Sequence, residues 1–260
     1  MSVLKRLFSD KIAVFCMVVI AAVVIVAIGA PVLAPHDPAE IDVTNKLAAM
    51  SAAYPLGTDQ LGRCILSRMM YGARTTIFVS LYTMAITIFI GSVLGIISGF
   101  FRGWVDEVIM RICDIMLSFP SEVMILSIIG VLGIGMKNLV IATIIAKWAW
   151  YTRMIRSIVI QYNDKNYIRF SKVAGCSTWH IITKHILPAT LGEIAVLATL
   201  DIGGIILNIS AMSFLGLGVQ PPTAEWGMML NAAKTVLMLH PSQMMIPGVA
   251  ILTVVAVFNF

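Results

Sequence analysis

The side chains of this sequence that could do chemistry are mainly charged residues placed within or beside long apolar stretches. They are Asp114, Glu122, Lys147, Glu193 and Asp201. A charge at the centre of a bilayer costs at least about 2.5–3.5 kcal/mol, so each should face a partner or a water-filled path. Lys147 could pair with Asp201 or Glu122. For Asp114, Glu122, Lys147 and Asp201 the pattern leaves open an interhelical ion pair, the lining of a translocation path and a direct cation site.

Histidine and cysteine give weaker signals. His36 with Asp37, and His240, offer imidazole and carboxylate groups that suit Ni²⁺, but they are isolated from one another. The four cysteines have no CxxC spacing, which argues against a zinc site and a disulfide framework. The chain contains no GxxxxGK(S/T) phosphate loop and no evident Ser/His/Asp or Cys/His arrangement. We therefore expect no metal, no cofactor and no catalytic residue in this chain.

The composition is that of a membrane protein. Of the 260 residues, 59% are hydrophobic and 12% are charged, whereas a soluble domain has about 25% charged residues. This predicts an all-α integral membrane protein with about six transmembrane helices. The formal net charge of +5 is better explained by lysines and arginines that set the topology than by binding of nucleic acid. Membrane lipid is therefore an expected partner.

Six apolar segments define the predicted organisation. The first is too long for the apolar core of a signal peptide, which has about 7–15 residues, so it is read as an uncleaved helix. The predicted spans are residues 12–35, 75–101, 104–135, 139–160, 191–212 and 244–260. Residues 1–11 form a cytoplasmic N-terminus, 36–74 and 213–243 are external segments, and 161–188 are a cytoplasmic loop. This orientation places eleven lysines and arginines inside and six outside, as the positive-inside rule expects.

The cytoplasmic loop is predicted to form two short helices. Asn163 or Asp164 can cap a helix that runs to about Ala174, and Gly175 suits the position that follows a helix end. Ser177 can cap a second helix that ends before Pro188.

Each of these helices has an apolar face. The residues on these faces are Tyr167, Phe170 and Ala174 in the first helix and Trp179, Ile182 and Ile186 in the second. Lys172, His180 and Lys184 lie elsewhere on the helices. Such an elbow could bind another protein or lie on lipid headgroups, and the residues alone leave both possibilities open.

The spacing from Arg169 through Gly175 to Pro188 resembles the EAA loop of ABC importer permeases. In that family the loop reads Glu-Ala-Ala, three residues, Gly, and then a run that closes on Ile-Leu-Pro. Here the first three positions are occupied by Arg, Phe and Ser, while the glycine and the closing Ile-Leu-Pro are kept. The family's loop is a coupling helix that docks in a groove of an ATP-binding subunit. The resemblance assigns this coupling to Arg169, Phe170, Ser171, Gly175, Trp179, His180, Ile182, Lys184, Ile186, Leu187 and Pro188.

The resemblance covers nearly the whole chain. PLGTDQLGR (55–63), SRMMYGART (67–75) and MSFLGLGVQPPTAEWGMML (212–230) are similar to the second permease subunit of dipeptide, oligopeptide and nickel importers. KWAWYTRMIRS (147–157) and LATLDIG (197–203) look closer to the nickel branch. Cys64 departs from the family, which usually has Asp there. Members also continue past the sixth span with a polar tail, so the sequence is expected to be cut short.

This resemblance implies the ABC importer type I permease fold, in a bacterial inner membrane. The chain would form half of a path for nickel, free or chelated. Its expected partners are a second homologous permease, two cytoplasmic ATP-binding subunits that hold ATP and Mg, and an external substrate-binding protein. The alternative within the family is an importer of di- or oligopeptides. The alternative from another class is a proton-coupled transporter that uses Asp201 and Lys147, although inverted repeats and broken spans are not visible.

Gly91, Gly95 and Gly99 recur every four residues, the spacing of small residues that lets two helices approach closely. We expect this stripe to pack within the helix bundle or against a second permease.

Overall fold

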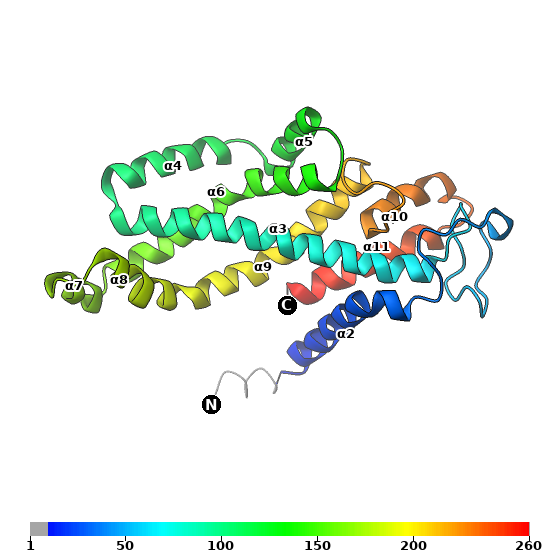
Figure 1. Cartoon of the computed structure of the whole chain (residues 1–260), viewed down its shortest axis with the longest axis horizontal. Helices are drawn as coiled ribbons and strands as arrows, with labels where there is room; N and C mark the ends of the chain where they lie inside the picture. The colour runs from blue at the N-terminus through cyan, green and yellow to red at the C-terminus, as the bar shows by residue number, and fades with distance from the viewer. Residues whose placement is uncertain (1–9, 260) are drawn as a thin grey trace. The chain divides into compact units, whose positions relative to one another are not determined.

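The computed structural model describes residues 10–259, and these residues form helices and no strand (Figure 1). The all-α prediction is therefore confirmed. The predicted cytoplasmic N-terminus falls mostly on residues 1–9, which lie outside the described residues, as does Phe260.

The principal helices follow the predicted order of the apolar segments. They are α2 (Lys11–Leu33), α3 (Ile65–Phe101), α4 (Gly103–Leu117), α5 (Ser121–Leu132), α6 (Met136–Asn163), α7 (Asn166–Val173), α8 (Thr178–Ile181), α9 (Leu187–Phe214), α10 (Trp226–Ala233) and α11 (Ser242–Phe258). Two 3-10 turns, η1 (Val43–Asn45) and η3 (Lys234–Val236), and a π turn, η2 (Ile182–Ile186), complete the described elements.

The chain divides into two compact units, which we describe separately. The terminal unit comprises Met1–Leu81, Gly133–Leu139 and Asp201–Phe260, and in it α11 contacts both α10 and α2. The central unit comprises Tyr82–Leu132 and Val140–Leu200. Its buried core is mainly aliphatic and joins residues of α3, α6, the loop helices and α9: Ile96, Phe100, Tyr151, Ile155, Val159, Ile168, Ile181, Ile186 and Ile194.

Fewer helices meet a length and hydropathy requirement for a membrane span than the six that were predicted. Among the described residues, α2, α3 and the continuous run Thr178–Phe214 do so, and α4 with α5 would be a fourth if this bent pair is one span. Helix α6 is long enough, but its charged residues lower its mean hydropathy. Helix α11 is apolar, but with 17 residues it is too short to meet the requirement.

The segment predicted as one span over 104–135 is broken. Helices α4 and α5 meet at a bend of 85° across Ser118, Phe119 and Pro120. Pro120 has no N–H to donate, and its ring disfavours the helical conformation of Phe119 before it. The apolar composition of this segment predicted one continuous span, but its proline breaks the helix.

Candidate coupling elbow

Residues 165–187, here called the elbow, form α7, a tight turn, α8 and the start of a longer helix. Figure 1 shows α7 and α8 as two short helices that contact each other. The turn between them is a Schellman motif: the Gly175 N–H donates to the Lys172 carbonyl and the Cys176 N–H to the Ser171 carbonyl, both at 3.1 Å. Gly175 has φ +77°, a conformation that favours glycine. The predicted role of this glycine matches its observed geometry.

The predicted cap of the first helix is wrong. Helix α6 continues through Asn163, and α7 begins three residues later, with Lys165 at its cap position and no side-chain cap bond. The Asn163 side chain is buried and bonded elsewhere. Its amide donates to the carbonyls of Gly99 (3.3 Å) and Phe100 (3.1 Å) and accepts from Lys172 Nζ (2.7 Å). Asn163 therefore makes tertiary hydrogen bonds and does not cap α7. A capping pattern in the sequence does not reveal such contacts.

Pro188 does not end the second helix. Ser177 caps α8 as predicted, by accepting from the His180 N–H at 3.3 Å, but the helix then runs on through Phe214. The π turn η2 ends two residues before the proline, and the Leu187 N–H donates to the Ile182 carbonyl five residues back. Because a proline lacks an N–H and clashes with the carbonyl four residues back, the wider turn accommodates it.

The π turn also changes which residues share a face. Trp179 and Ile186, predicted to lie on one apolar face, are opposite in environment: the tryptophan is exposed and the isoleucine is fully buried. Ile168, Ile181 and Ile186 instead anchor the elbow in the core of the central unit. The prediction assumed a constant helical period, and one wider turn shifts the faces.

The outward side of the elbow carries large apolar groups. Phe170, Val173 and Trp179 are 75%, 86% and 75% exposed, and Tyr167 is also exposed. We call these four residues the apolar quartet. Large apolar side chains exposed among polar residues are typical of a surface that binds another molecule.

Ion pairs tie the elbow to the turn between α3 and α4. Arg102 Nη2 lies 2.7 Å from Asp164 Oδ2, and Arg169 Nη2 lies 3.6 Å from Asp164 Oδ1. The hydrogen bond from Arg102 holds the pKa of the Asp164 carboxyl below its ordinary value. Lys172 adds a cation–π contact, with Nζ 4.9 Å from the centroid of the Phe100 ring.

The remaining predicted coupling residues have varied surroundings. The Ser171 hydroxyl donates to the Tyr167 carbonyl at 2.8 Å, and the rings of His180 and His185 lie 5.6 Å apart. Lys184 and Pro188 are exposed, whereas Ile182 and Leu187 are partly buried against the core. The residues with accessible side chains are the ones that could contact a partner, and the buried ones hold the elbow in shape.

Of the acidic residues predicted within spans, Asp114 and Glu122 have the following side-chain partners. Asp114 of α4 forms an ion pair with Arg153 of α6. Glu122 accepts from the Ser121 hydroxyl at 2.9 Å. Lys147 belongs to the central unit and Asp201 to the terminal unit, so their pairing stays a prediction.

An ion pair between α4 and α6 was missed by sequence reasoning. Arg156 binds Asp106 through two nitrogens, each at 2.5 Å, and the Ser98 hydroxyl donates to the same carboxylate at 2.5 Å. These residues come from three helices and share no local motif. Together with the Asp114 pair, the pair between Asp106 and Arg156 gives α4 two ionic links to α6. These two links explain why α6 carries charges along an apolar segment.

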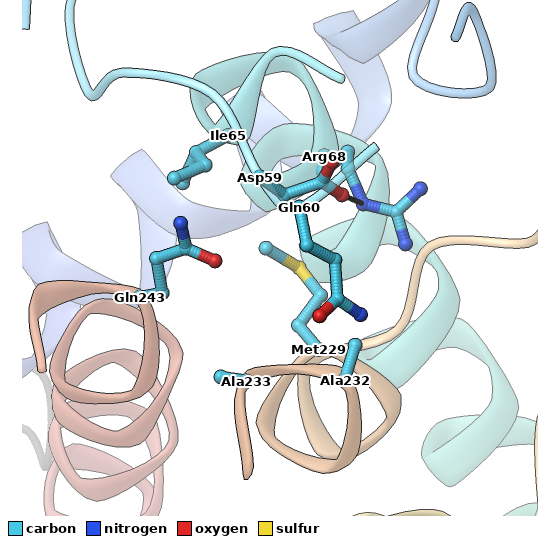
Figure 2. Close-up of a pocket in the computed structure, with 8 residues that line it drawn as sticks. All are labelled: Asp59, Gln60, Ile65, Arg68, Met229, Ala232, Ala233 and Gln243. Carbon is cyan, nitrogen blue, oxygen red and sulfur yellow. Dashed lines mark ion pairs between the residues drawn. The ribbon is translucent and has the colours of Figure 1, made fainter. Parts of the chain in front are cut away.

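In the terminal unit, the motif PLGTDQLGR builds a buried polar junction. Asp59 pairs with Arg63 at 2.7 Å and with Arg68 at 3.6 Å, and Arg68 donates to the Pro38 carbonyl at 2.9 Å. Figure 2 shows Asp59 and Arg68 at a small pocket to which α10 contributes Met229 and α11 contributes Gln243. The motif is also bonded to α11, because the Gln243 side-chain amide donates to the Thr58 carbonyl at 3.2 Å.

A second buried junction contains Glu225, which caps α10. Its carboxylate accepts from the N–H groups of Gly227 (3.0 Å) and Met228 (2.8 Å), and from the hydroxyls of Thr76 (3.1 Å) and Ser210 (3.2 Å). Burial raises the pKa of this carboxyl above its ordinary value. Three helices, α3, α9 and α10, meet at this one side chain.

The histidine and aspartate that could suggest nickel outside the spans are used otherwise. The His36 ring stacks on Tyr54 with centroids 4.7 Å apart, and the backbone N–H of His36 donates to the Ser67 hydroxyl at 3.1 Å. Asp37 accepts from the Ala39 N–H at 2.7 Å. Within residues 10–259 no three His, Cys, Asp or Glu side chains gather where they could hold a metal ion.

The helical fold, the apolar spans and the elbow define a multi-pass membrane permease. The family model for the binding-protein-dependent transport system inner membrane component matches residues 91–260, and the model for the N-terminal transmembrane domain of oligopeptide transport permease C matches residues 2–50. The chain belongs to this family of ABC importer permeases, as the sequence resemblance predicted.

Several relatives match almost end to end. The chain is 46% identical to the metal-staphylopine import system permease protein CntC of Staphylococcus aureus, over 100% of this chain and 90% of the relative. It is 37% identical to the nickel transport system permease protein NikC of Escherichia coli, over 94% and 88%. It is 38% identical to the dipeptide transport system permease protein DppC of Alkalihalophilus pseudofirmus, over 98% and 84%. Membership in this family sets aside the proton-coupled transporter.

Proposed function

We propose that this chain forms half of the translocation path of an importer for nickel, free or held by a small chelator. The observation that carries the proposal is the similarity to two permeases whose names specify metal–staphylopine and nickel. The dipeptide relative, at 38% identity, supports di- or oligopeptides as the second candidate substrate.

The proposed assembly contains a second homologous permease, two cytoplasmic ATP-binding subunits and an external substrate-binding protein. ATP and Mg are bound by the ATP-binding subunits, which carry out hydrolysis, and the N-terminus of this chain lies in the cytoplasm. The family description, which specifies a binding-protein-dependent system, supports the external partner. The excess of lysines and arginines in the predicted inner loops supports the orientation.

In this proposal the elbow is the lever that the ATP-binding subunits move. The apolar quartet faces outward, while Ile168, Ile181 and Ile186 pack with residues of α3, α6 and α9 in one core. A close-packed core transmits displacement because its side chains have little free volume. Movement of the elbow therefore displaces the adjoining ends of the spans and switches the path between its inward-facing and outward-facing forms.

The substrate is tested by uptake in cells that do or do not carry the gene. Labelled nickel, supplied free or with a small chelator, and a labelled dipeptide are compared under the same conditions. We expect loss of the gene to reduce nickel uptake and to leave dipeptide uptake unchanged. The reverse result would assign the chain to peptide import, and no change in either would overturn both.

The elbow is tested with the double variant Phe170→Ala and Trp179→Ala. Removing two exposed aromatic anchors should weaken association with the ATP-binding subunits by about 2–4 kcal/mol while membrane insertion is retained. Co-purification and ATPase activity of the assembled importer measure the effect. Phe89→Ala, on α3 and 69% exposed, is the matched control and should leave association unchanged. Deleting residues 165–187 is a blunter test, because it also removes three buried isoleucines.

A further inference from the structure

The elbow carries a cation where the family pattern has an acid. Arg169 stands at the first position of the motif, and its side chain is 65% exposed. Its guanidinium lies 3.6 Å from Asp164 Oδ1, which is longer than a strong charge-assisted hydrogen bond. An exposed pair of this length contributes little to the stability of the fold.

Asp164 does not depend on Arg169. Arg102 binds the other oxygen of the Asp164 carboxylate at 2.7 Å and also donates to the Ile160 carbonyl at 3.4 Å. If Arg169 turned away, Asp164 would keep its closer partner. Arg169 is therefore available to a different anion without leaving a carboxylate unpaired.

The surroundings of Arg169 are predominantly positive. Between residues 161 and 188 the sequence has four lysines and arginines and a single acid, Asp164. Lys172 is held by Asn163 and by the Phe100 ring, whereas Lys165 and Lys184 are exposed. The apolar quartet thus sits in a positive field, and interfaces between proteins are favoured when the opposing potentials are complementary.

We propose that Arg169 exchanges Asp164 for a carboxylate of the ATP-binding subunit when the elbow docks, in an apolar groove bordered by acidic residues. This inference rests on the proposed function, because it requires the elbow to face that subunit. The planar guanidinium can bind a carboxylate through two parallel hydrogen bonds, which fixes the orientation of the docked elbow as well as its affinity. The apolar quartet supplies the contact area, and Arg169 selects the partner.

The first measurement is affinity in the detergent-purified importer with its ATP-binding subunits. Arg169→Glu should weaken association by at least about tenfold, and the loss should diminish as salt screens the repulsion. Arg111→Glu makes the same change of charge on α4, where the side chain is 75% exposed, and should have little effect. If both variants behave alike, net charge explains the result and the proposal is overturned.

The second measurement identifies the partner group. Arg169→Lys places an amine at the same position, and a carbodiimide joins an amine to a carboxylate in direct contact as an amide. We expect a cross-link between residue 169 of this variant and an Asp or Glu of the ATP-binding subunit, located by mass spectrometry. The native chain has no amine at this position, and Arg111→Lys should give no such product.

The remaining outcomes decide between alternatives. If the subunits assemble but Arg169→Lys cross-links only to Asp164, the exchange does not occur. If Arg169→Glu reduces assembly only in vesicles that contain phosphatidylglycerol, and not in detergent, the anion is a lipid headgroup and the proposal is wrong. If the native chain fails to bind the ATP-binding subunits at all, the proposed function itself fails, which separates the two ideas.

Discussion

At the scale of single residues, Glu225 shows how a motif can be recognised before its role is understood. The sequence EWG belongs to one of the segments that carried the family resemblance, but nothing in it foretold a junction of three helices. The backbone explains the glycine as well: a Cβ on Gly227 would lie 2.1 Å from the Ser210 carbonyl oxygen. Trp226 donates from its indole N–H to the Met69 carbonyl at 3.0 Å. Each residue of the motif therefore has its own contact.

The raised pKa of Glu225 predicts a pH dependence of stability. Because the folded protein holds this proton more tightly than the unfolded chain, the contribution of the group is full below the ordinary pKa of 4.5 and is lost as pH rises toward the folded-state pKa. Glu225→Gln has no proton to lose. The thermal stability of the native chain relative to this variant should therefore fall as the pH rises above the ordinary pKa of 4.5.

Thermal unfolding in detergent, followed at several pH values, measures this difference. Glu107→Gln is the control, because Glu107 is exposed on α4 and makes only a 4.0 Å pair with Arg111. Parallel curves for the native chain and Glu225→Gln would show that Glu225 does not titrate differently in the folded state.

At the scale of elements, the glycine stripe of α3 is explained by its contact with α6. A Cβ on Gly91 would lie 2.5 Å from the Tyr151 Cβ, and one on Gly95 would lie 2.8 Å from the Thr152 carbonyl oxygen. Gly99 meets the Arg156 carbonyl oxygen at 2.9 Å in the same way. Of the two expectations from the sequence, packing within the bundle is the one that the structure shows.

Gly95→Ala should therefore destabilise the central unit. Alanine gains about 1 kcal/mol over glycine in a helix, but overpacking against a backbone carbonyl costs about 1–3 kcal/mol. We expect a net loss of thermal stability for Gly95→Ala. Gly130→Ala, on α5, is the control, because an added Cβ there meets nothing within 4 Å and should be neutral or stabilising. Equal shifts in the two variants would contradict close packing of α3 on α6.

The helices and turns also show how much of the fold could be predicted from the sequence. Apolar segments located the long helices, and Gly175 and Ser177 were assigned their turn and cap correctly. Two prolines were misread in opposite directions: Pro120 breaks a segment that composition made continuous, and Pro188 lies within a helix that it was expected to end. The local effect of proline was known, but whether a π turn would absorb it depends on packing that a single sequence does not display.

The candidate site was predicted in part for the same reason. Spacing and resemblance placed the elbow, whereas the roles of its residues depend on contacts made far along the chain. Asn163 pairs with backbone groups of Gly99 and Phe100, and Asp164 pairs with Arg102. No local pattern indicates such partners, so the division between anchoring and accessible residues required the structure.

At the scale of the whole molecule, the orientation of the elbow in the membrane is the prediction on which coupling depends. Cys176 is exposed in the turn of the elbow, whereas Cys16, Cys64 and Cys113 are buried. A maleimide that cannot cross membranes should therefore label Cys176 in inverted vesicles and fail to do so in intact cells. Cys176→Ser should abolish the labelling. Labelling of Cys176 in intact cells would place the elbow outside and would contradict its coupling to cytoplasmic ATP-binding subunits.

The π turn η2 contains one residue more than an α-helical turn. This extra residue affects how the elbow is oriented relative to α9. Each residue of an α-helix advances the chain by about 100° around its axis, so converting the π turn to an α turn by removing one residue would rotate everything before it by about that angle. Trp179 would then point in another direction, while α9 kept its place in the core. A single deletion here would therefore reorient the whole loop and would also turn Ile181 away from the core in which it is buried.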